Sequence, residues 1–300
     1  MQEMVGLIGL GEMGEGMARN ILKNGYSVVV HDLRSERMTR LAQAGAEMAN
    51  NPAEVADRCR WIVLVLPDGS VVQSVVLGEG GILDHLEEAH ILIDCGTTHP
   101  TTTIDIHNEV RRQGARFIDA PVSGMKARAD DGCLTMMAGG DPGAFAEVTP
   151  LLESMADNIT YMGGSGNGQL TKILNNVLFN ISIAAMSELL PLAVKLGLDP
   201  EKLQKVVSTG SGQSYGFDHF SELALSRDFQ TGYAMDKARK DMDAVLEFAE
   251  EERVELVLAE AAMRTYEETL RSGFGAENKA AMVKVWEEKL GVLVRKQEDR

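Results

Sequence analysis

The chain has 300 residues, which is long for one ordinary domain and sufficient for two. Its 29 lysines and arginines against 45 aspartates and glutamates give a formal net charge of −16, which argues against a nucleic-acid or anionic-membrane partner. A hydrophobic content of 44% with 25% charged residues is typical of a globular protein and argues against extensive disorder.

Short apolar runs alternate with longer helical segments in the first half of the chain. The predicted strands are residues 5–9, 27–31, 61–66, 91–94, 116–120, 134–138 and 159–162. The run 61–66 is apolar without alternation, as expected of a strand that is covered on both faces. This alternation predicts an α/β fold with a mainly parallel, doubly wound sheet.

A cluster of glycines at residues 163–168 ends the strand-containing region, and no strand is predicted after it. A long apolar helix is predicted from about 169 to 196, and Asp199 followed by Pro200 marks the start of the next helix. The acidic run 247–255 is predicted to be a solvated helix face. We expect a dinucleotide-binding domain at residues 1–163 and an all-α domain for substrate and oligomerisation at 164–300.

The apolar stretch 177–194 contains Asn180, Glu188 and Pro191, which favours a buried helix over a membrane span. Three cysteines without a CxxC pair and six histidines without ligand spacing predict no disulfide framework and no metal site. No targeting segment is visible ahead of the first strand, so we expect a cytoplasmic protein.

A glycine-rich turn, GLGEMG, follows the first predicted strand and opens a helix predicted at residues 15–24. In this context GxGxxG is the fingerprint of dinucleotide binding. Gly9 permits the tight turn, Gly11 lets the backbone approach a pyrophosphate, and Gly14 lets the helix pack closely. Glu12 and Met13 complete the turn, whose free N–H groups and positive dipole end favour phosphate.

Asp32 lies at the end of the second strand, eighteen positions after Gly14. A carboxylate there accepts hydrogen bonds from the ribose hydroxyls and repels a 2′-phosphate, which favours NAD over NADP. Arg34 and Arg37 follow closely and keep NADP open as a cofactor. A helix N-cap is the alternative interpretation of Asp32.

Three further motifs accompany this turn: DAPVSG at 119–124, GNGQLTKILNN at 166–176, and the pair Lys240 and Asp241. Together with residues 5–14, they resemble the 3-hydroxyisobutyrate dehydrogenase, or β-hydroxyacid dehydrogenase, family over nearly the whole chain. The resemblance implies an N-terminal Rossmann-type domain, a long connecting helix and a C-terminal helical domain, with the active site between the domains. It also implies reversible hydride transfer between a nicotinamide cofactor and a short β-hydroxyacid or its semialdehyde.

The same resemblance assigns residues to roles. Lys172 is the expected general acid/base, and Asn176, one helical turn further on, would orient the substrate. A lysine is a poor base at neutral pH unless burial or a neighbouring cation lowers its pKa, and Lys240 is the candidate for that cation. The remaining expected positions are Ser123, Gly124 and Asn175 for substrate, and Leu66, Pro67, Thr97 and Lys240 for cofactor.

The chain departs from the common family pattern after Ser123 and Gly124, where many relatives have a second glycine. Here Met125, Lys126 and Arg128 follow. The two cations are either solvated loop charges or ligands for a second anionic group on the substrate, which a guanidinium suits well.

Other functions stay open. The 6-phosphogluconate dehydrogenases resemble the Lys172 motif but carry His in place of Asn175, and imine reductases typically lack the lysine. NADPH-dependent glyoxylate or succinic semialdehyde reductases usually carry Asn–Arg where this chain has Asp32 and Leu33. A non-catalytic nicotinamide-binding oligomerisation module would be expected to lack Lys172. The apolar long helix predicts a homodimer or homotetramer, and the expected partner is a small anionic hydroxyacid or semialdehyde.

Overall fold

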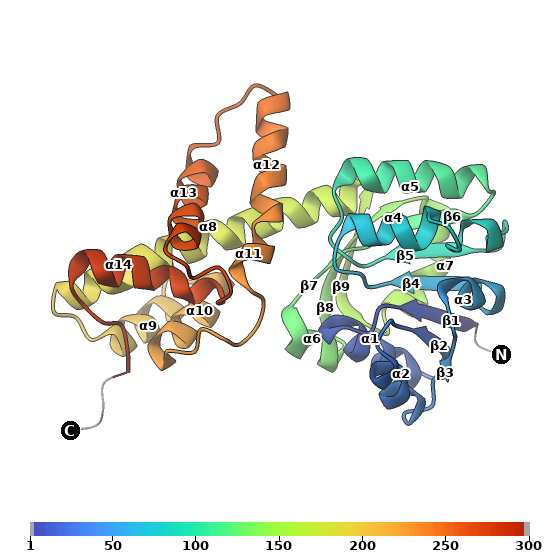
Figure 1. Cartoon of the computed structure of the whole chain (residues 1–300), viewed down its shortest axis with the longest axis horizontal. Helices are drawn as coiled ribbons and strands as arrows, with labels where there is room; N and C mark the ends of the chain where they lie inside the picture. Colours follow the sequence, from blue (N-terminus) through green and yellow to red (C-terminus); the bar gives the residue numbers. More distant parts are fainter. Residues whose placement is uncertain (1–2, 297–300) are drawn as a thin grey trace. The chain divides into compact units, whose positions relative to one another are not determined.

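The computed structural model describes residues 3–296 and divides into two compact units, residues 1–172 and 173–300 (Figure 1). The elements of the first unit are β1 (Met4–Ile8), α1 (Glu12–Lys23), β2 (Ser27–His31), α2 (Ser35–Ala42), β3 (Glu47–Met48), α3 (Pro52–Arg58), β4 (Trp61–Leu64), α4 (Gly69–Leu77), η1 (Leu83–His85), β5 (Ile91–Asp94), α5 (Pro100–Arg112), β6 (Arg116–Asp119), β7 (Val122–Ser123), α6 (Met125–Asp131), β8 (Leu134–Gly140), α7 (Pro142–Leu152) and β9 (Ala156–Gly163). Helix α8 (Asn167–Lys195) begins in the first unit and continues into the second. The second unit then contains α9 (Pro200–Thr209), α10 (Tyr215–Ser226), α11 (Met235–Ala238), α12 (Lys240–Glu251), α13 (Val257–Arg271), η2 (Lys279–Ala281) and α14 (Met282–Leu290).

The sheet has the order β3-β2-β1-β4-β5-β6-β8-β7, and β9 pairs with β8. Strands β1 to β6 are parallel, which confirms the predicted doubly wound sheet. The sheet is mainly parallel, as predicted, because only its edge departs: β8 runs antiparallel to β6, and β7 runs antiparallel to β8. Strands β3 and β7 were not predicted, since two residues are too few to show periodicity.

The predicted strand limits were wrong at several ends. Strand β4 ends at Leu64 rather than at 66, whereas β8 extends to Gly140 and β9 starts at Ala156. The additions contain glycines and polar residues, which carry no strand signal of their own. These added residues adopt strand conformation because β8 and β9 pair with each other.

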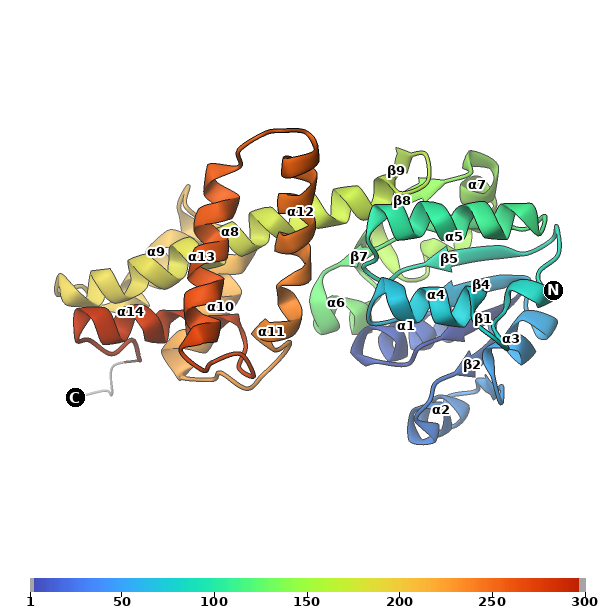
Figure 2. The same ribbon diagram turned by 45° about the horizontal axis from the view of Figure 1, so that its top comes forward.

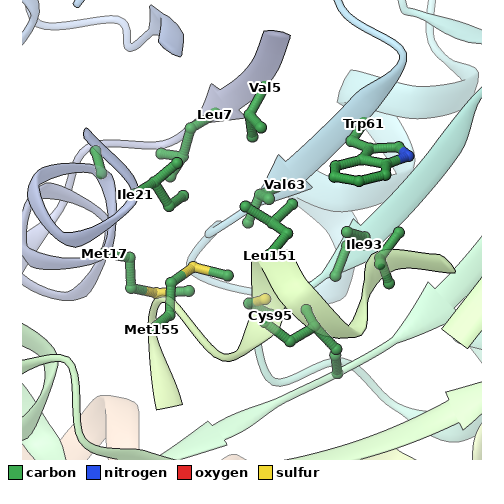
Figure 3. Packing of buried hydrophobic residues seen from close by; sticks show 14 of the residues in the cluster. Val5, Leu7, Met17, Ile21, Trp61, Val63, Ile93, Cys95, Leu151 and Met155 are labelled. Atoms are coloured by element: carbon green, nitrogen blue, oxygen red, sulfur yellow. The ribbon is translucent and has the colours of Figure 1, made fainter. Parts of the chain in front are cut away.

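Each face of the sheet has its own hydrophobic core. Val5 and Leu7 of β1 pack with residues of α1, α6 and α7 on one face (Figure 3). Helices α3, α4 and α5 cover the other face (Figure 2), and Ile8 belongs to the core that their residues form there. The alternation follows from the two-residue period of a strand. The sheet is therefore covered on both sides, and its carboxyl edge is left for ligands.

The second unit is helical, with Tyr266 fully buried in its core. The predicted start of α9 is confirmed, because the Asp199 carboxylate accepts hydrogen bonds from the N–H groups of Glu201 and Lys202. The acidic residues of the run 247–255 are exposed while Ala249 is buried, and α12 ends at Glu251, so only the first part of the run is helical. By length and composition α8 could cross a membrane, and half of its most apolar window is buried.

Candidate active site

The glycine-rich turn joins β1 to α1 with the geometry that a dinucleotide requires. Gly9 has a φ of 97°, a left-handed backbone that glycine adopts without strain. A Cβ on Gly14 would lie 2.0 Å from the Gly9 carbonyl oxygen, so α1 reaches the turn only with glycine there. A Cβ on Gly11 would meet nothing within 4 Å, which leaves room for a pyrophosphate. Helix α1 begins at Glu12, followed by Met13, earlier than the predicted residue 15.

Asp32 is a well-held carboxylate at the carboxyl end of β2. Its oxygens accept hydrogen bonds from the Leu10 N–H at 2.7 Å and the Arg34 N–H at 2.8 Å, and the Arg37 guanidinium lies 3.2 Å away. Burial would raise the pKa of Asp32, but these three donors outweigh it and hold the pKa below its ordinary value. The side chain is thus an anion beside the glycine-rich turn.

The predicted cofactor residues Leu66, Pro67 and Thr97 lie in the loops after β4 and β5. Because β1, β4 and β5 are neighbours in parallel order, these loops share the edge that holds the glycine-rich turn. A Cβ on Gly96 would lie only 2.8 Å from the Leu66 carbonyl oxygen, so the two loops pack against each other. The structure therefore brings the predicted cofactor residues of the first unit to one edge.

A cavity of about 490 Å³ opens beside the glycine-rich turn. Side chains from α1, α2 and α6 line it, and most of them are charged: Glu12, Glu15, Arg19, Arg37, Arg40, Lys126 and Asp130, with Leu10 and Gly11. Arg40 and Arg19 bind Glu15 at 2.8 Å and 2.9 Å. The hydrogen bond from Arg40 is the main cause that lowers the pKa of Glu15 to about 2. Sequence reasoning missed these two arginines, for which the only signal was the helical spacing of Glu15 and Arg19.

The segment after Ser123 is helix α6 rather than the predicted loop. Gly124 has a φ of 141°, and Met125 has a φ of 60°, a left-handed conformation that costs a non-glycine residue energy. Lys126 forms an ion pair with Asp130 and lines the cavity just described.

Arg128 is placed differently from Lys126. A Cβ on Gly124 would lie 2.9 Å from the Arg128 Cβ and 3.0 Å from its Cδ, so the arginine stem packs on the Ser123–Gly124 turn. Within residues 3–296 its guanidinium makes no hydrogen bond or ion pair. Of the two predicted cations, the structure therefore sets only Arg128 against the predicted substrate turn.

Lys172 lies near the start of α8, in the first unit, and is 8% exposed. Asn176 follows one turn later on the same helix, in the second unit. Its Nδ2 donates a hydrogen bond to Asp241 at 2.8 Å, and its Oδ1 accepts one from Asn175 at 3.2 Å. Lys240 is the first residue of α12. The hydrogen bond from Asn176 to Asp241 therefore connects, within the second unit, the end of the motif at 166–176 to the Lys240–Asp241 pair.

Among residues 3–296, no group of three or more His, Cys, Asp and Glu side chains is arranged to hold a metal ion. His99 caps α5 by accepting a hydrogen bond from the Thr101 N–H at 3.4 Å.

The doubly wound sheet, the glycine-rich turn and Asp32 together define an NAD(P)-binding domain. Residues 4–163 match the family model described as the NAD binding domain of 6-phosphogluconate dehydrogenase. Residues 166–286 match the model described as NAD-binding of NADP-dependent 3-hydroxyisobutyrate dehydrogenase. The chain belongs to the 3-hydroxyisobutyrate dehydrogenase family and is an NAD(P)-dependent hydroxyacid dehydrogenase that acts on CH–OH donors.

Individual relatives agree with this assignment. The chain is 34% identical over 291 residues to 2-(hydroxymethyl)glutarate dehydrogenase of Eubacterium barkeri, covering 97% of each chain. It is similar to the solved 3-hydroxyisobutyrate dehydrogenase from Salmonella typhimurium, with a TM-score of 0.88, 28% identity and coverage of 95% and 100%. A structure described as Psf3 in complex with NADP+ and 2-OPP has a TM-score of 0.85 at 27% identity, with coverage of 94% and 99%.

Proposed function

We propose that the protein transfers a hydride between NAD and a short β-hydroxyacid or its semialdehyde, with Lys172 as the general acid/base. The nicotinamide supplies the hydride acceptor or donor when the cofactor is bound. Lys172 Nζ takes the hydroxyl proton as the hydride leaves carbon, and returns it in the reverse direction. The observation that carries this proposal is the buried Lys172 on a helix whose first turn is anchored at the carboxyl edge of the sheet.

Other residues of the chain hold the substrate in this proposal. The Ser123 hydroxyl and the Gly124 N–H bind the substrate carboxylate, and Asn176 orients the reacting oxygen. Because the Asn176 amide is already fixed by Asp241 and Asn175, its orientation costs little entropy on binding. Initial rates at 340 nm with NAD and a panel of β-hydroxyacids test this activity. The absence of turnover with every member, together with no NAD binding by calorimetry, would support a non-catalytic module instead.

NAD is the proposed cofactor because the ionised Asp32 would repel a 2′-phosphate. One observation favours NADP as the alternative, with the protein working as an NADPH-dependent semialdehyde reductase. Arg37 lies 3.2 Å from Asp32 and lines the cavity beside the turn. Its guanidinium could therefore bind the 2′-phosphate of NADP. The ratio of kcat/KM for NAD and NADP separates the two.

We further propose that Arg128 binds a second anionic group of the substrate, such as a distal carboxylate. Its stem packs on the Ser123–Gly124 turn while its guanidinium keeps its five donors for a ligand. A relative that covers 97% of the chain is named for the dicarboxylate 2-(hydroxymethyl)glutarate, which supports this substrate class.

The test compares 2-(hydroxymethyl)glutarate with the mono-anionic 3-hydroxyisobutyrate. The variant Arg128→Ala should lower kcat/KM for the di-anion about 10- to 100-fold more than for the mono-anion, since a hydrogen bond to a charged group contributes about 1.5–3 kcal/mol. Lys126→Ala is the matched control, because Lys126 is paired with Asp130 and lines the cavity beside the glycine-rich turn. An unchanged ratio in Arg128→Ala would refute the role of Arg128.

Self-association through the helical unit is also part of the proposal. Helix α8 exposes large apolar side chains, with Leu178 71%, Leu189 59% and Leu196, just beyond its end, 72% exposed. Exposed apolar side chains along one helix are typical of subunit contacts. Light scattering at micromolar protein should give a dimer or tetramer mass, and a monomer mass would contradict this part.

A further inference from the structure

Two buried carboxylates lie side by side at the carboxyl edge of the sheet. Asp94 ends β5 and Asp119 ends β6, and they are register partners in adjacent parallel strands. Both side chains are 0% exposed. Burying two anions next to each other is costly unless every oxygen is satisfied, so the partners of these oxygens indicate what the pair is for.

The Asp119 carboxylate, at the end of β6, caps the start of α8. Its Oδ1 accepts a hydrogen bond from the Gly166 N–H at 2.9 Å, and its Oδ2 accepts one from the Gln169 N–H at 3.1 Å. A Cβ on Gly168 would lie 2.8 Å from the same carboxylate, so the helix start fits only because glycine is there. Lys172 lies three residues after Gln169, on the same helix face. The carboxylate of Asp119 therefore fixes the turn that carries Lys172.

The Gln169 side chain connects this helix start to the loop after β5. Its Oε1 accepts a hydrogen bond from the Thr98 N–H at 2.9 Å. Its Nε2 donates to the Gly96 carbonyl at 3.0 Å and lies 3.4 Å from Asp94 Oδ2. Thr97, the predicted cofactor residue, lies between these two contacts. One amide thus clamps the loop on both sides of Thr97.

Asp94, at the end of β5, binds the same loop through its carboxylate. Its Oδ1 accepts a hydrogen bond from the Gly96 N–H, and its Oδ2 accepts one from the Thr98 hydroxyl, both at 2.9 Å. Asp119, in turn, begins the DAPVSG segment that leads to Ser123. These hydrogen-bond partners of the two carboxylates therefore lie in segments that carry a residue of the proposed active site.

We infer that Asp94, Asp119 and Gln169 are positioning residues that hold the general acid/base, the cofactor loop and the substrate turn in one arrangement. The inference rests on the proposed function, which assigns those three roles. None of the three side chains needs to touch the reacting atoms. Each acts through the backbone that it fixes, as outer-shell partners do around other reactive groups.

The test uses Asp119→Asn and Gln169→Met in the full chain. Asparagine keeps the shape but offers one acceptor where two N–H groups point, so the Lys172 turn should shift. We expect kcat to fall about 10- to 100-fold, with a larger primary isotope effect on hydride transfer and an unchanged Kd for NAD. Gln169→Met releases the Thr97 loop and should in addition raise KM for NAD.

Asp141→Asn is the matched control, because Asp141 caps α7 by the same kind of bond, to the Ala144 N–H, outside the proposed site. It should leave kcat and the isotope effect unchanged. If Asp119→Asn lowers only the melting temperature, as the control does, the positioning role is refuted. If Asp119→Asn does not fold, wild-type kcat and NAD KM in Gln169→Met would refute it equally.

Failure of the proposed function gives a different result. If Lys172→Met keeps wild-type turnover, the proposed general acid/base is wrong whatever Asp119→Asn does. If Lys172→Met is inactive while Asp119→Asn and Gln169→Met match the wild type, the function stands and only the positioning role is lost.

Discussion

Replacing Asp119 by asparagine should change how the stability of the protein depends on pH. Burial raises the pKa of Asp119 to about 6 from an ordinary 3.8, and the charge of Asp94 adds to the rise, although the Gly166 and Gln169 N–H groups oppose it. One pKa unit corresponds to about 1.4 kcal/mol, so ionising this carboxyl group costs the folded protein about 3 kcal/mol.

The direction of the pH dependence of folding stability follows from which state, folded or unfolded, binds the proton. Between about pH 4 and pH 6, folded Asp119 keeps a proton that the unfolded chain has released, so folding stability falls as pH rises through this window. Asparagine does not titrate. The free energy of unfolding of Asp119→Asn, taken relative to the wild type, should therefore rise by about 2.4 kcal/mol between pH 4 and pH 7, because the unfolded carboxyl group is already partly ionised at pH 4.

Urea unfolding followed by circular dichroism at the two pH values measures this difference. Carboxyl groups present in both proteins cancel when the wild-type value is subtracted. Asp141→Asn, which removes an exposed carboxylate, provides the reference for a helix cap. A difference that stays constant between pH 4 and pH 7 would refute the reasoning, because it would mean that ionised Asp119 is fully compensated by its two N–H donors.

Two further substitutions test the cofactor site. Asp32→Asn should lower kcat/KM for NAD about 10- to 100-fold and improve the relative use of NADP, because charge-assisted bonds to the ribose are lost along with the repulsion of a 2′-phosphate. Initial rates at 340 nm with both cofactors measure this, and an unchanged NAD/NADP ratio would contradict it. Gly14→Ala should abolish NAD binding by calorimetry, since its Cβ would lie 2.0 Å from the Gly9 carbonyl oxygen. Gly212→Ala, where a Cβ makes only ordinary contact at 3.5 Å, is the control, and NAD binding by Gly14→Ala equal to that of the control would contradict the proposed turn.

The sequence predicted the elements that have strong local signals. Strands β2 and β5 match their predicted limits because their β-branched or apolar runs are bounded by loops. The start of α9 was correct because Asp199 and Pro200 act within a few residues of each other. Helix α6 was missed because its seven residues, MKARADD, show no apolar periodicity, and its position is set by packing against α1, where Asn20 donates hydrogen bonds to the carbonyls of Ala129 and Asp130.

The candidate site was predictable only where a motif is contiguous. The glycine-rich turn and Asp32 could be assigned from spacing, and Lys172 from resemblance. The proximity of Asp94 and Asp119 could not be predicted, because strand pairing brings together residues that are 25 positions apart. No local pattern in the sequence indicates that pairing. The same holds for Arg40, which reaches Glu15 only through the packing of α2 beside α1.

The central claim is that Lys172 moves the proton during NAD-dependent oxidation of a β-hydroxyacid. The most direct test is the single-turnover rate of NADH formation at 340 nm for the wild type and Lys172→Met, with 3-hydroxyisobutyrate and 2-(hydroxymethyl)glutarate as substrates. The proposal predicts turnover by the wild type with at least one of them, and a rate about 10²- to 10⁴-fold lower in the variant with an unchanged Kd for NAD. A variant that forms NADH at the wild-type rate would contradict the claim.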